Sequence, residues 1–352
     1  MSRRIRRSAL PIMLALVALP LAGCSAAGGA GSTPMPTGRT FSNPITSQGQ
    51  DPWVIKDGDR YLLAESRDGG IWLTVSPKND LTGIDSGTAH RIWTQPVDGP
   101  DSQDVWAPEL HHIDGHWYVY FAATTADKDN ANHRMFVLES ATDDPLSTYT
   151  DKGRIADAAG RWAIDGTRFS WKGQDYFVWS GWPGGTDGQQ NLYIARMTSP
   201  TRLAGTGVLL SEPTLPWERT GNPIEEGPEA LEHDGRLFLV FSASGSWTDG
   251  YCLGMLHLTG ADPLDPKAWT KSPKPVFAGN ADVVSPGHAS FTTSPDGTQD
   301  WIVYHSAREA GAGWDRVVDT QRFTWNADGS PRFGQPVAPG APQALPSGQP
   351  AD

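Results

Sequence analysis

Acidic residues recur along this sequence at equivalent positions, each six to nine residues before a glycine in a turn-like segment. They are Asp51, Glu109, Asp165, Glu226 and Glu229, and in a fifth segment His288 takes that place. Carboxyl groups that meet at one point are costly to ionise together, because each charge raises the pKa of its neighbours. Proteins keep such groups for acid–base chemistry or for binding a cation more readily than for stability. The recurring acids therefore predict a functional site if the fold brings them together.

The elements that must position these acids are short hairpins. A turn is each time followed by an alternating aromatic and aliphatic stretch, and the turn glycines are Gly58, Gly115, Gly173, Gly235 and Gly297. Successive glycines are 57, 58, 62 and 62 residues apart. Asp-Gly between two strand-like stretches is a strong hairpin signal. Hairpins at a near-constant spacing indicate equivalent sheet units in a radial array.

We therefore predict an all-β fold, a five-bladed β-propeller over about residues 42–335. The first strand of each blade lines the central channel of a propeller, and the acids fall on those strands. We expect them to converge on one axial site. A β-sandwich or two stacked β domains is the alternative, which the even spacing disfavours.

The composition excludes several classes of protein. The 352 residues carry 40 acidic against 28 basic side chains, without the basic stripe that nucleic-acid binding needs. Aromatic residues, at 10%, are too plentiful for a disordered chain. Two cysteines cannot cross-link a fold of this size, and we expect Cys252 to be a small buried apolar residue. The 15 tryptophans suit sugar stacking, but tryptophan also fills β cores.

Both ends of the chain are expected to lie outside the propeller. Four arginines in the first seven residues precede the apolar run Ala9–Ala22, and Leu21-Ala22-Gly23-Cys24 is typical of a bacterial lipoprotein cleavage site. We interpret residues 1–24 as a lipoprotein-type signal peptide, with an ordinary secretory signal as the alternative. Cys24 would then carry a lipid anchor outside the cytoplasmic membrane. Residues 25–41 are predicted to be a flexible tether, and residues 336–352 a disordered Pro-rich tail.

Short motifs around the recurring acids resemble those of one enzyme family. They are Asp51-Pro52-Trp53, Trp106-Ala107-Pro108-Glu109, Asp165-Gly166-Thr167, Glu226-Gly227-Pro228 and Ser285-Pro286-Gly287-His288, one in each hairpin unit. This ordered set resembles glycoside hydrolase family 43, and the resemblance covers essentially the whole chain after the signal segment. The family implies a five-bladed propeller and hydrolysis with inversion at the anomeric carbon.

The resemblance also implies catalytic roles. Asp51 corresponds to the general base, Glu226 to the general acid, and Asp165 to a third acid that orients the general acid and sets its pKa. Inversion needs one carboxyl group to protonate the departing oxygen while another deprotonates a water on the opposite face. A negative neighbour raises the pKa of Glu226, while a more solvated Asp51 stays ionised. Asp51 and Asp165 could instead be turn residues, and composition does not separate Glu226 from Glu229.

We expect further residues to contact substrate. Trp53 and Trp106 are candidates for sugar stacking, with packing between blades as the alternative. Glu109 is expected to support the channel by hydrogen bonding. His288 corresponds to a histidine of the family that contacts a metal ion, commonly calcium, or the water shell of that ion. The resemblance therefore implies calcium in the central channel.

One departure from the family concerns the last unit. Many relatives carry an arginine two residues before a glutamine, and here Asp319 stands two residues before Gln321. We expect Arg316, three residues earlier, to reach the site through a bulge.

The fourth unit suggests a substrate. Tyr251-Cys252-Leu253-Gly254 resembles the same stretch in exo-α-L-arabinofuranosidases that act on arabinan. We expect a monomer that removes α-L-arabinofuranosyl residues from plant-type polysaccharide or oligosaccharide, contacts the membrane only through its lipid anchor and binds no nucleic acid. A β-xylosidase, an endo-arabinanase and a non-catalytic carbohydrate-binding propeller are the alternatives.

Overall fold

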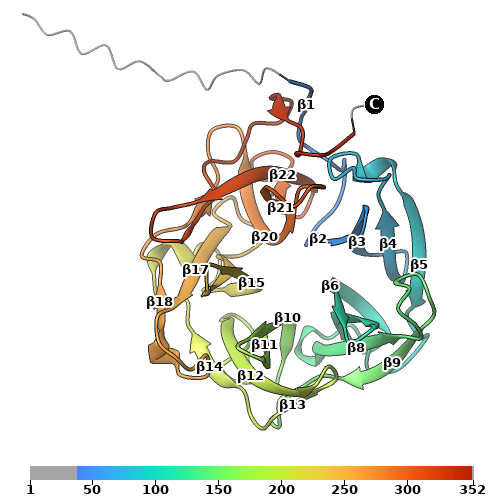
Figure 1. Ribbon diagram of the computed structural model, residues 1–352. Coiled ribbons are helices and arrows are strands. Elements are labelled where there is room, and N and C mark those ends of the chain that lie inside the picture. Colours follow the sequence, from blue (N-terminus) through green and yellow to red (C-terminus); the bar gives the residue numbers. More distant parts are fainter. Residues whose placement is uncertain (1–37, 351–352) are drawn as a thin grey trace, which may run out of the picture. The chain divides into compact units, whose positions relative to one another are not determined.

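The structure, a computed structural model, describes residues 38–350, which form five antiparallel sheets arranged as blades around a ring (Figure 1). Blade 1 contains β2 (Trp53–Asp57), β3 (Arg60–Arg67), β4 (Gly70–Val75) and β5 (Thr88–Thr94), and blade 2 contains β6 (Gln103–Ile113), β7 (His116–Thr124), β8 (Arg134–Ser140) and β9 (Tyr149–Arg154). Blade 3 contains β10 (Ala163–Trp171), β11 (Gln174–Gly181), β12 (Asn191–Ser199), β13 (Arg202–Leu203) and β14 (Val208–Ser211). Blade 4 contains β15 (Glu225–His233), β16 (Arg236–Ala243), β17 (Cys252–Leu258), β18 (Trp269–Lys271) and β19 (Phe277–Ala278), and blade 5 contains β20 (Val284–Thr293), β21 (Asp300–Ala307), β22 (Arg316–Trp325) and β23 (Pro331–Arg332). The predicted five-bladed propeller is confirmed.

Helical structure among the described residues is limited to single 3₁₀ turns. They are η1 (Ile84–Ser86), η2 (Asn130–Asn132), η3 (Pro216–Glu218) and η4 (Pro266–Ala268). In this part of the chain, no helix has the length and apolar character that a membrane crossing requires.

The predicted hairpins connect the first and second strands of the blades. Asp114 and Gly115 have φ values of 50° and 80°, and Asp234 and Gly235 have 48° and 70°. Two consecutive left-handed residues form the turn whose twist matches that of the flanking strands, and aspartate and glycine tolerate this conformation well.

The first strands of the blades surround the axis. β2 contacts β6, β6 contacts β10, β10 contacts β15, β15 contacts β20, and β20 returns to β2. This closed ring of inner strands brings together residues that are far apart in the sequence.

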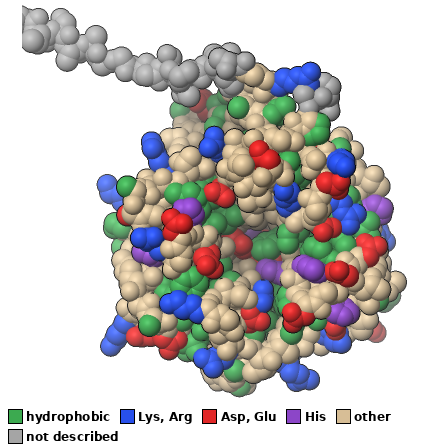
Figure 2. Space-filling model, in the orientation of Figure 1, with side chains coloured by type: hydrophobic (Ala, Val, Ile, Leu, Met, Phe, Trp, Pro, Cys, Tyr) green, Lys and Arg blue, Asp and Glu red, His purple; other side chains and the backbone are tan. Residues whose placement is uncertain are grey.

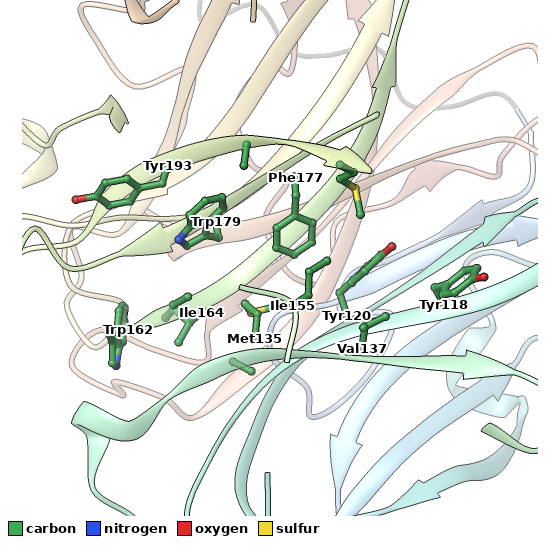
Figure 3. Packing of buried hydrophobic residues seen from close by; sticks show 14 of the residues in the cluster. Tyr118, Tyr120, Met135, Val137, Ile155, Trp162, Ile164, Phe177, Trp179 and Tyr193 are labelled. Atoms are coloured by element: carbon green, nitrogen blue, oxygen red, sulfur yellow. The ribbon is translucent and has the colours of Figure 1, made fainter. Parts of the chain in front are cut away.

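Apolar side chains packed between blades fix the inner strands relative to one another. Between blades 2 and 3, Tyr120, Ile164, Phe177 and Trp179 belong to one buried cluster (Figure 3). The Tyr120 and Phe177 ring centroids are 5.2 Å apart. Strand β10 passes so close that a Cβ on Gly166 would lie 2.4 Å from the Phe177 ring, which explains the glycine. This packing holds in place the strands that carry the acids.

The segment after residue 335 differs from the prediction. Strand β24 (Gln343–Ala344) pairs with β1 (Thr40–Phe41), and the Gln349 side chain accepts from the backbone N–H of Leu81 and donates to Asp80 and Thr82. The prediction of a disordered tail is therefore wrong for residues 336–350. Hydrogen bonds to distant residues order this segment, although its own sequence has no periodic pattern.

Other predictions for the chain ends lie mostly outside the described residues. The signal peptide, Cys24 and most of the tether fall within residues 1–37. Within the end of the predicted tether, Thr40 and Phe41 form β1.

Candidate active site

Most of the recurring acids lie on inner strands at breaks in the regular pairing, whereas Asp51 lies two residues before β2. The register with the second strand shifts between Trp106 and Glu109 in β6, Ile164 and Thr167 in β10, Glu226 and Glu229 in β15, and on both sides of Gly287 in β20. The motif prolines and glycines explain these shifts, because proline cannot donate to the ladder and glycine marks bulges. A bulge redirects a side chain, and here it turns the acids out of the blade cores.

Left-handed backbone accompanies the bulges. Asp51, Asp165 and His288 have φ values of 49°, 52° and 45°. For residues other than glycine this conformation costs of order 1–3 kcal/mol, and such strain concentrates at functional sites. As a result, three side chains from blades 1, 3 and 5 meet.

Asp51 lies among three basic side chains of blade 5. Its Oδ1 is 3.1 Å from His288 Nδ1, 3.3 Å from His305 Nδ1 and 3.5 Å from Arg316 Nη1. The Asp51 N–H donates to His305 Nδ1 at 3.0 Å, so this ring nitrogen is an acceptor and the imidazole is neutral. The Asp51 side chain keeps 23% exposure, which leaves it accessible to water. Acidic and histidine side chains also gather around the hollow of the face in Figure 2.

Asp165 and Glu226 form the other half of the site. Asp165 Oδ2 accepts from the Gly227 N–H at 3.2 Å and lies 4.0 Å from His288 Nδ1. The Tyr251 hydroxyl donates to Glu226 Oε1 at 2.8 Å. This hydrogen bond leaves Oε2 as the oxygen that can carry an acidic proton.

The surroundings give Asp51 and Glu226 opposite protonation preferences. Burial raises the pKa of Asp51, but the charge and hydrogen bond of the protonated His288 outweigh it and hold the pKa well below its usual range. Burial and the negative charge of Asp165 raise the pKa of Glu226 to about 8. Near neutral pH one carboxyl group is therefore ionised and the other protonated.

Two further groups share this electrostatic environment. Burial raises the pKa of Asp165 to about 6, against the opposing charge of His288. Burial lowers the pKa of His288, but the charges of Asp51 and Asp165 outweigh it and raise the pKa to about 9. His288 is thus an imidazolium between two carboxyl groups, which stabilises both as anions.

Glu109 and Glu229 form a separate acidic pair. A hydrogen bond of 3.0 Å joins Glu109 Oε2 and His111 Nε2, and Glu229 accepts from the Thr167 hydroxyl at 3.2 Å. Burial raises the pKa of Glu229 to about 8, and burial with the charge of Glu229 raises that of Glu109 well above its usual range. Glu109 is thus hydrogen-bonded to a residue of its own strand, and its supporting role stays a prediction.

The two candidate stacking tryptophans differ in exposure. Trp53 is 9% exposed, donates its indole N–H to the Leu110 carbonyl at 2.8 Å, and packs on His111 with ring centroids 4.6 Å apart. These contacts support the alternative of packing between blades 1 and 2. Trp106 is 36% exposed and stacks on His133 at 3.8 Å, which leaves part of its surface open to a ligand.

Arg316 reaches the site without the expected bulge. It is the first residue of β22, and the pairing of β22 with β21 is regular from Arg316 to Phe323. Its Nη2 donates to the Ser246 carbonyl at 2.7 Å while Nη1 faces Asp51. Asp319, by contrast, is buried and accepts from the Ser306 hydroxyl at 2.6 Å.

The residues around His288 do not fit the expected calcium ion. Calcium takes about six to eight oxygen ligands, whereas His288 Nδ1 faces Asp51 and Asp165 as a cation. Between residues 38 and 350, no three His, Cys, Asp or Glu side chains are arranged to hold a metal. The calcium ion stays a prediction.

A buried ion cluster supports the strand that carries Glu226. Lys271 Nζ donates to Glu218 at 2.9 Å and also to Glu225, and both carboxyl groups are fully buried. Removing the cation from buried carboxylates typically costs about 3–5 kcal/mol. We therefore expect Lys271→Ala to lower the free energy of unfolding in urea by about this amount. The exposed Lys274→Ala serves as the control, and an unchanged denaturation midpoint for Lys271→Ala would contradict the prediction.

Sequence reasoning missed two residues of the site as functional groups. Tyr251 precedes β17 and His305 lies on β21, so neither stands on an inner strand where the acids recur. Their rings stack with centroids 5.6 Å apart. In the sequence, Tyr251 is distinguished only by the resemblance of its segment to arabinan-degrading relatives, and no repeating signal marks His305.

Comparisons with known proteins agree with this geometry. The chain is 37% identical over 350 residues to an extracellular exo-α-(1→5)-L-arabinofuranosidase of Streptomyces avermitilis, covering 96% of this chain and 72% of the relative. It is 36% identical to a protein of the same name from Streptomyces chartreusis, covering 82% and 90%. The crystal structure of an α-L-arabinofuranosidase from Lactobacillus brevis superposes with a TM-score of 0.79 at 35% identity, covering 85% of this chain and 97% of that one. The model of glycosyl hydrolases family 43 matches residues 41–331. The chain therefore belongs to glycoside hydrolase family 43.

Proposed function

We propose that this protein is an exo-acting α-L-arabinofuranosidase that cleaves arabinan or arabinose-containing oligosaccharides with inversion. The observation that carries the proposal is the opposite protonation preference of Asp51 and Glu226 within one site. The names of the two Streptomyces relatives support the choice of sugar and the exo mode.

Glu226 is proposed as the general acid. Its proton, on Oε2, passes to the glycosidic oxygen as the bond to the anomeric carbon breaks. The carboxylate left behind accepts from Tyr251, and the nearby positive charge of His288 stabilises it. Asp165 sustains the acid in its protonated form, because its negative charge opposes ionisation of Glu226.

Asp51 is proposed as the general base. It takes one proton from a water molecule, whose oxygen bonds to the anomeric carbon on the face opposite the leaving group. His288 and Arg316 keep Asp51 ionised and hold its carboxylate in place. The products are free arabinose of inverted configuration and the shortened alcohol, and exchange with solvent restores both carboxyl groups.

Hydrolysis assays test the substrate and the mode of action. The purified protein would be incubated with aryl α-L-arabinofuranoside, aryl β-D-xyloside and linear arabinan. We expect release from the arabinofuranoside, and arabinose alone from arabinan. Release only from the xyloside would identify a β-xylosidase, and oligosaccharide products from arabinan an endo-arabinanase. Binding of oligosaccharides without any hydrolysis would identify a non-catalytic propeller.

The pH profile should show the state of Glu226. Its raised pKa means that the protonated, active form persists below about pH 8 and is lost above it. We therefore expect kcat/KM to fall as the pH rises through about 8. In Asp165→Asn the negative neighbour is absent, so this basic limb should move to lower pH. A basic limb at the same pH in Asp165→Asn would contradict the role of Asp165.

We also propose that the protein acts outside the cell, attached by a lipid at Cys24. Support comes from the signal-like residues 1–24 and from relatives named extracellular. Mass spectrometry of the mature N-terminal peptide tests the anchor, because a diacylglyceryl group on Cys24 has a defined mass. An unmodified peptide that begins elsewhere would show an ordinary secretory signal.

A further inference from the structure

Two exposed tryptophans lie on neighbouring loops of blades 4 and 5. Trp247 follows β16 and is 40% exposed, and Trp314 precedes β22 and is 63% exposed. Their ring centroids are 6.1 Å apart with an interplanar angle of 71°, an edge-to-face pair. Large apolar surface is seldom left open to water without a ligand or a partner.

The surrounding backbone holds this tryptophan pair in place. The Trp247 ring lies so close to Gly245 that an added Cβ would be 2.8 Å from it. The Trp314 indole N–H donates to the Ser246 hydroxyl at 3.2 Å, and Asp249 accepts from the Gly311 N–H at 2.8 Å. These hydrogen bonds join the two loops. A ligand would therefore meet a surface that is already ordered, which lowers the entropic cost of binding.

Residues of the same two loops contact the proposed catalytic groups or their neighbours. The Ser246 carbonyl accepts from Arg316, which faces Asp51, and Tyr251, at the end of the Trp247 loop, donates to Glu226. The Trp247 loop leads through Tyr251 into β17, and the Trp314 loop leads into β22, whose first residue is Arg316; these strands lie in adjacent blades (Figure 1). The tryptophan pair is thus joined to the groups that hold the proposed acid and base.

We propose that Trp247 and Trp314 form a subsite for the sugar on the leaving-group side of the cleaved bond in an α-1,5-linked arabinan chain. This inference rests on the proposed function. Indole rings offer a rigid apolar face to the C–H groups of a furanose, with little rotamer freedom to lose. Continuity with Arg316 and Tyr251 favours substrate over a protein partner.

The test compares substrates with and without a leaving-group sugar. The full chain and its Trp247→Ala/Trp314→Ala variant would be assayed on α-1,5-arabinotriose and on methyl α-L-arabinofuranoside. We expect kcat/KM on arabinotriose to fall about tenfold or more, mainly through a higher KM. Tryptophan surface that a ligand covers often contributes most of the binding energy. On the methyl glycoside it should stay within about twofold, since the affected contact is absent there. Trp72→Ala, on β4 of blade 1, is the matched control.

Each outcome has a defined meaning. An equal loss on both substrates would show a structural role for the pair, and no loss on either would show that the surface does not bind this substrate. Binding of arabinotriose to Glu226→Gln, measured by calorimetry with and without the tryptophan pair, separates the two proposals. If the parent hydrolyses no arabinoside, the proposed function fails. The subsite still stands if removing the pair weakens this binding, and fails if binding is absent or unchanged.

Discussion

Glu226→Gln should lose about 10²–10⁴-fold in kcat/KM on arabinan oligosaccharides, the usual contribution of a general acid. The glutamine keeps the shape of the side chain and can still accept from Tyr251, but it has no acidic proton. A sugar alkoxide is a poor leaving group and needs that proton, whereas a dinitrophenolate leaves without it. The loss on 2,4-dinitrophenyl α-L-arabinofuranoside should therefore be much smaller.

The control for this experiment lies on the same strand. Glu232 of β15 is exposed, and Glu232→Gln changes the same chemical group away from the site. It should match the parent on both substrates. Equal losses of Glu226→Gln on the two substrates would contradict the role of acid, because the effect would not depend on the leaving group.

Asp51→Asn should lose about 10²–10⁴-fold as well, but to a similar extent on both substrates. Water must be deprotonated whatever group departs, so a better leaving group does not reduce the loss of kcat/KM in this variant. The substitution also removes the anion that faces His288 and Arg316, and His288 should lose its proton more readily as a result.

Circular dichroism shows whether Asp51→Asn keeps the parental fold, so that a loss of activity can be assigned to the missing carboxylate. Asp59→Asn, at an exposed surface ion pair with Lys78 in the same blade, is the matched control. An unaltered fold with near-complete loss of activity would support the role of base. Retention of parental activity by Asp51→Asn would overturn the proposed mechanism.

The fold could be predicted because its signals are local and repeated. Asp114-Gly115 and Asp234-Gly235 specify left-handed turns, and the strands that follow alternate in hydrophobicity, so each hairpin is encoded within about a dozen residues. The near-constant spacing then gives the number of blades. The tail could not be predicted in this way, because the residues that order Gln349 are Asp80 and Thr82, which lie 269 and 267 residues earlier in the chain.

The site was predictable only where it follows the repeat. Asp51, Asp165 and Glu226 stand at equivalent places in the repeat, and the motifs of Asp165 and Glu226 supply the glycine and proline that disturb their inner strands. His305 and Trp314 belong to a second strand and a loop, where no repeat marks them. Their roles depend on which residues face them across a blade boundary, which sequence spacing does not specify.

Arg316 shows the limit of reasoning by correspondence. The bulge is expected from the sequence because Arg316 stands five residues before Gln321, whereas many relatives carry the arginine two residues before the glutamine. The structure needs no bulge, because Arg316 is the first residue of β22 and its long side chain extends from the strand end to Asp51.

The position of Asp51 between blade 1 and blade 5 also bears on how the enzyme matures. The Asp51 N–H donates to a histidine 254 residues later, and its carboxylate faces Arg316 near the end of the last blade. Contacts of such long sequence separation form late in folding, because loop closure must precede them. Before blade 5 has folded, the proposed base would lie in solvent, without the His288 cation that lowers its pKa. The proposed mechanism therefore requires a closed ring, and a chain that lacks blade 5 should have no hydrolytic activity.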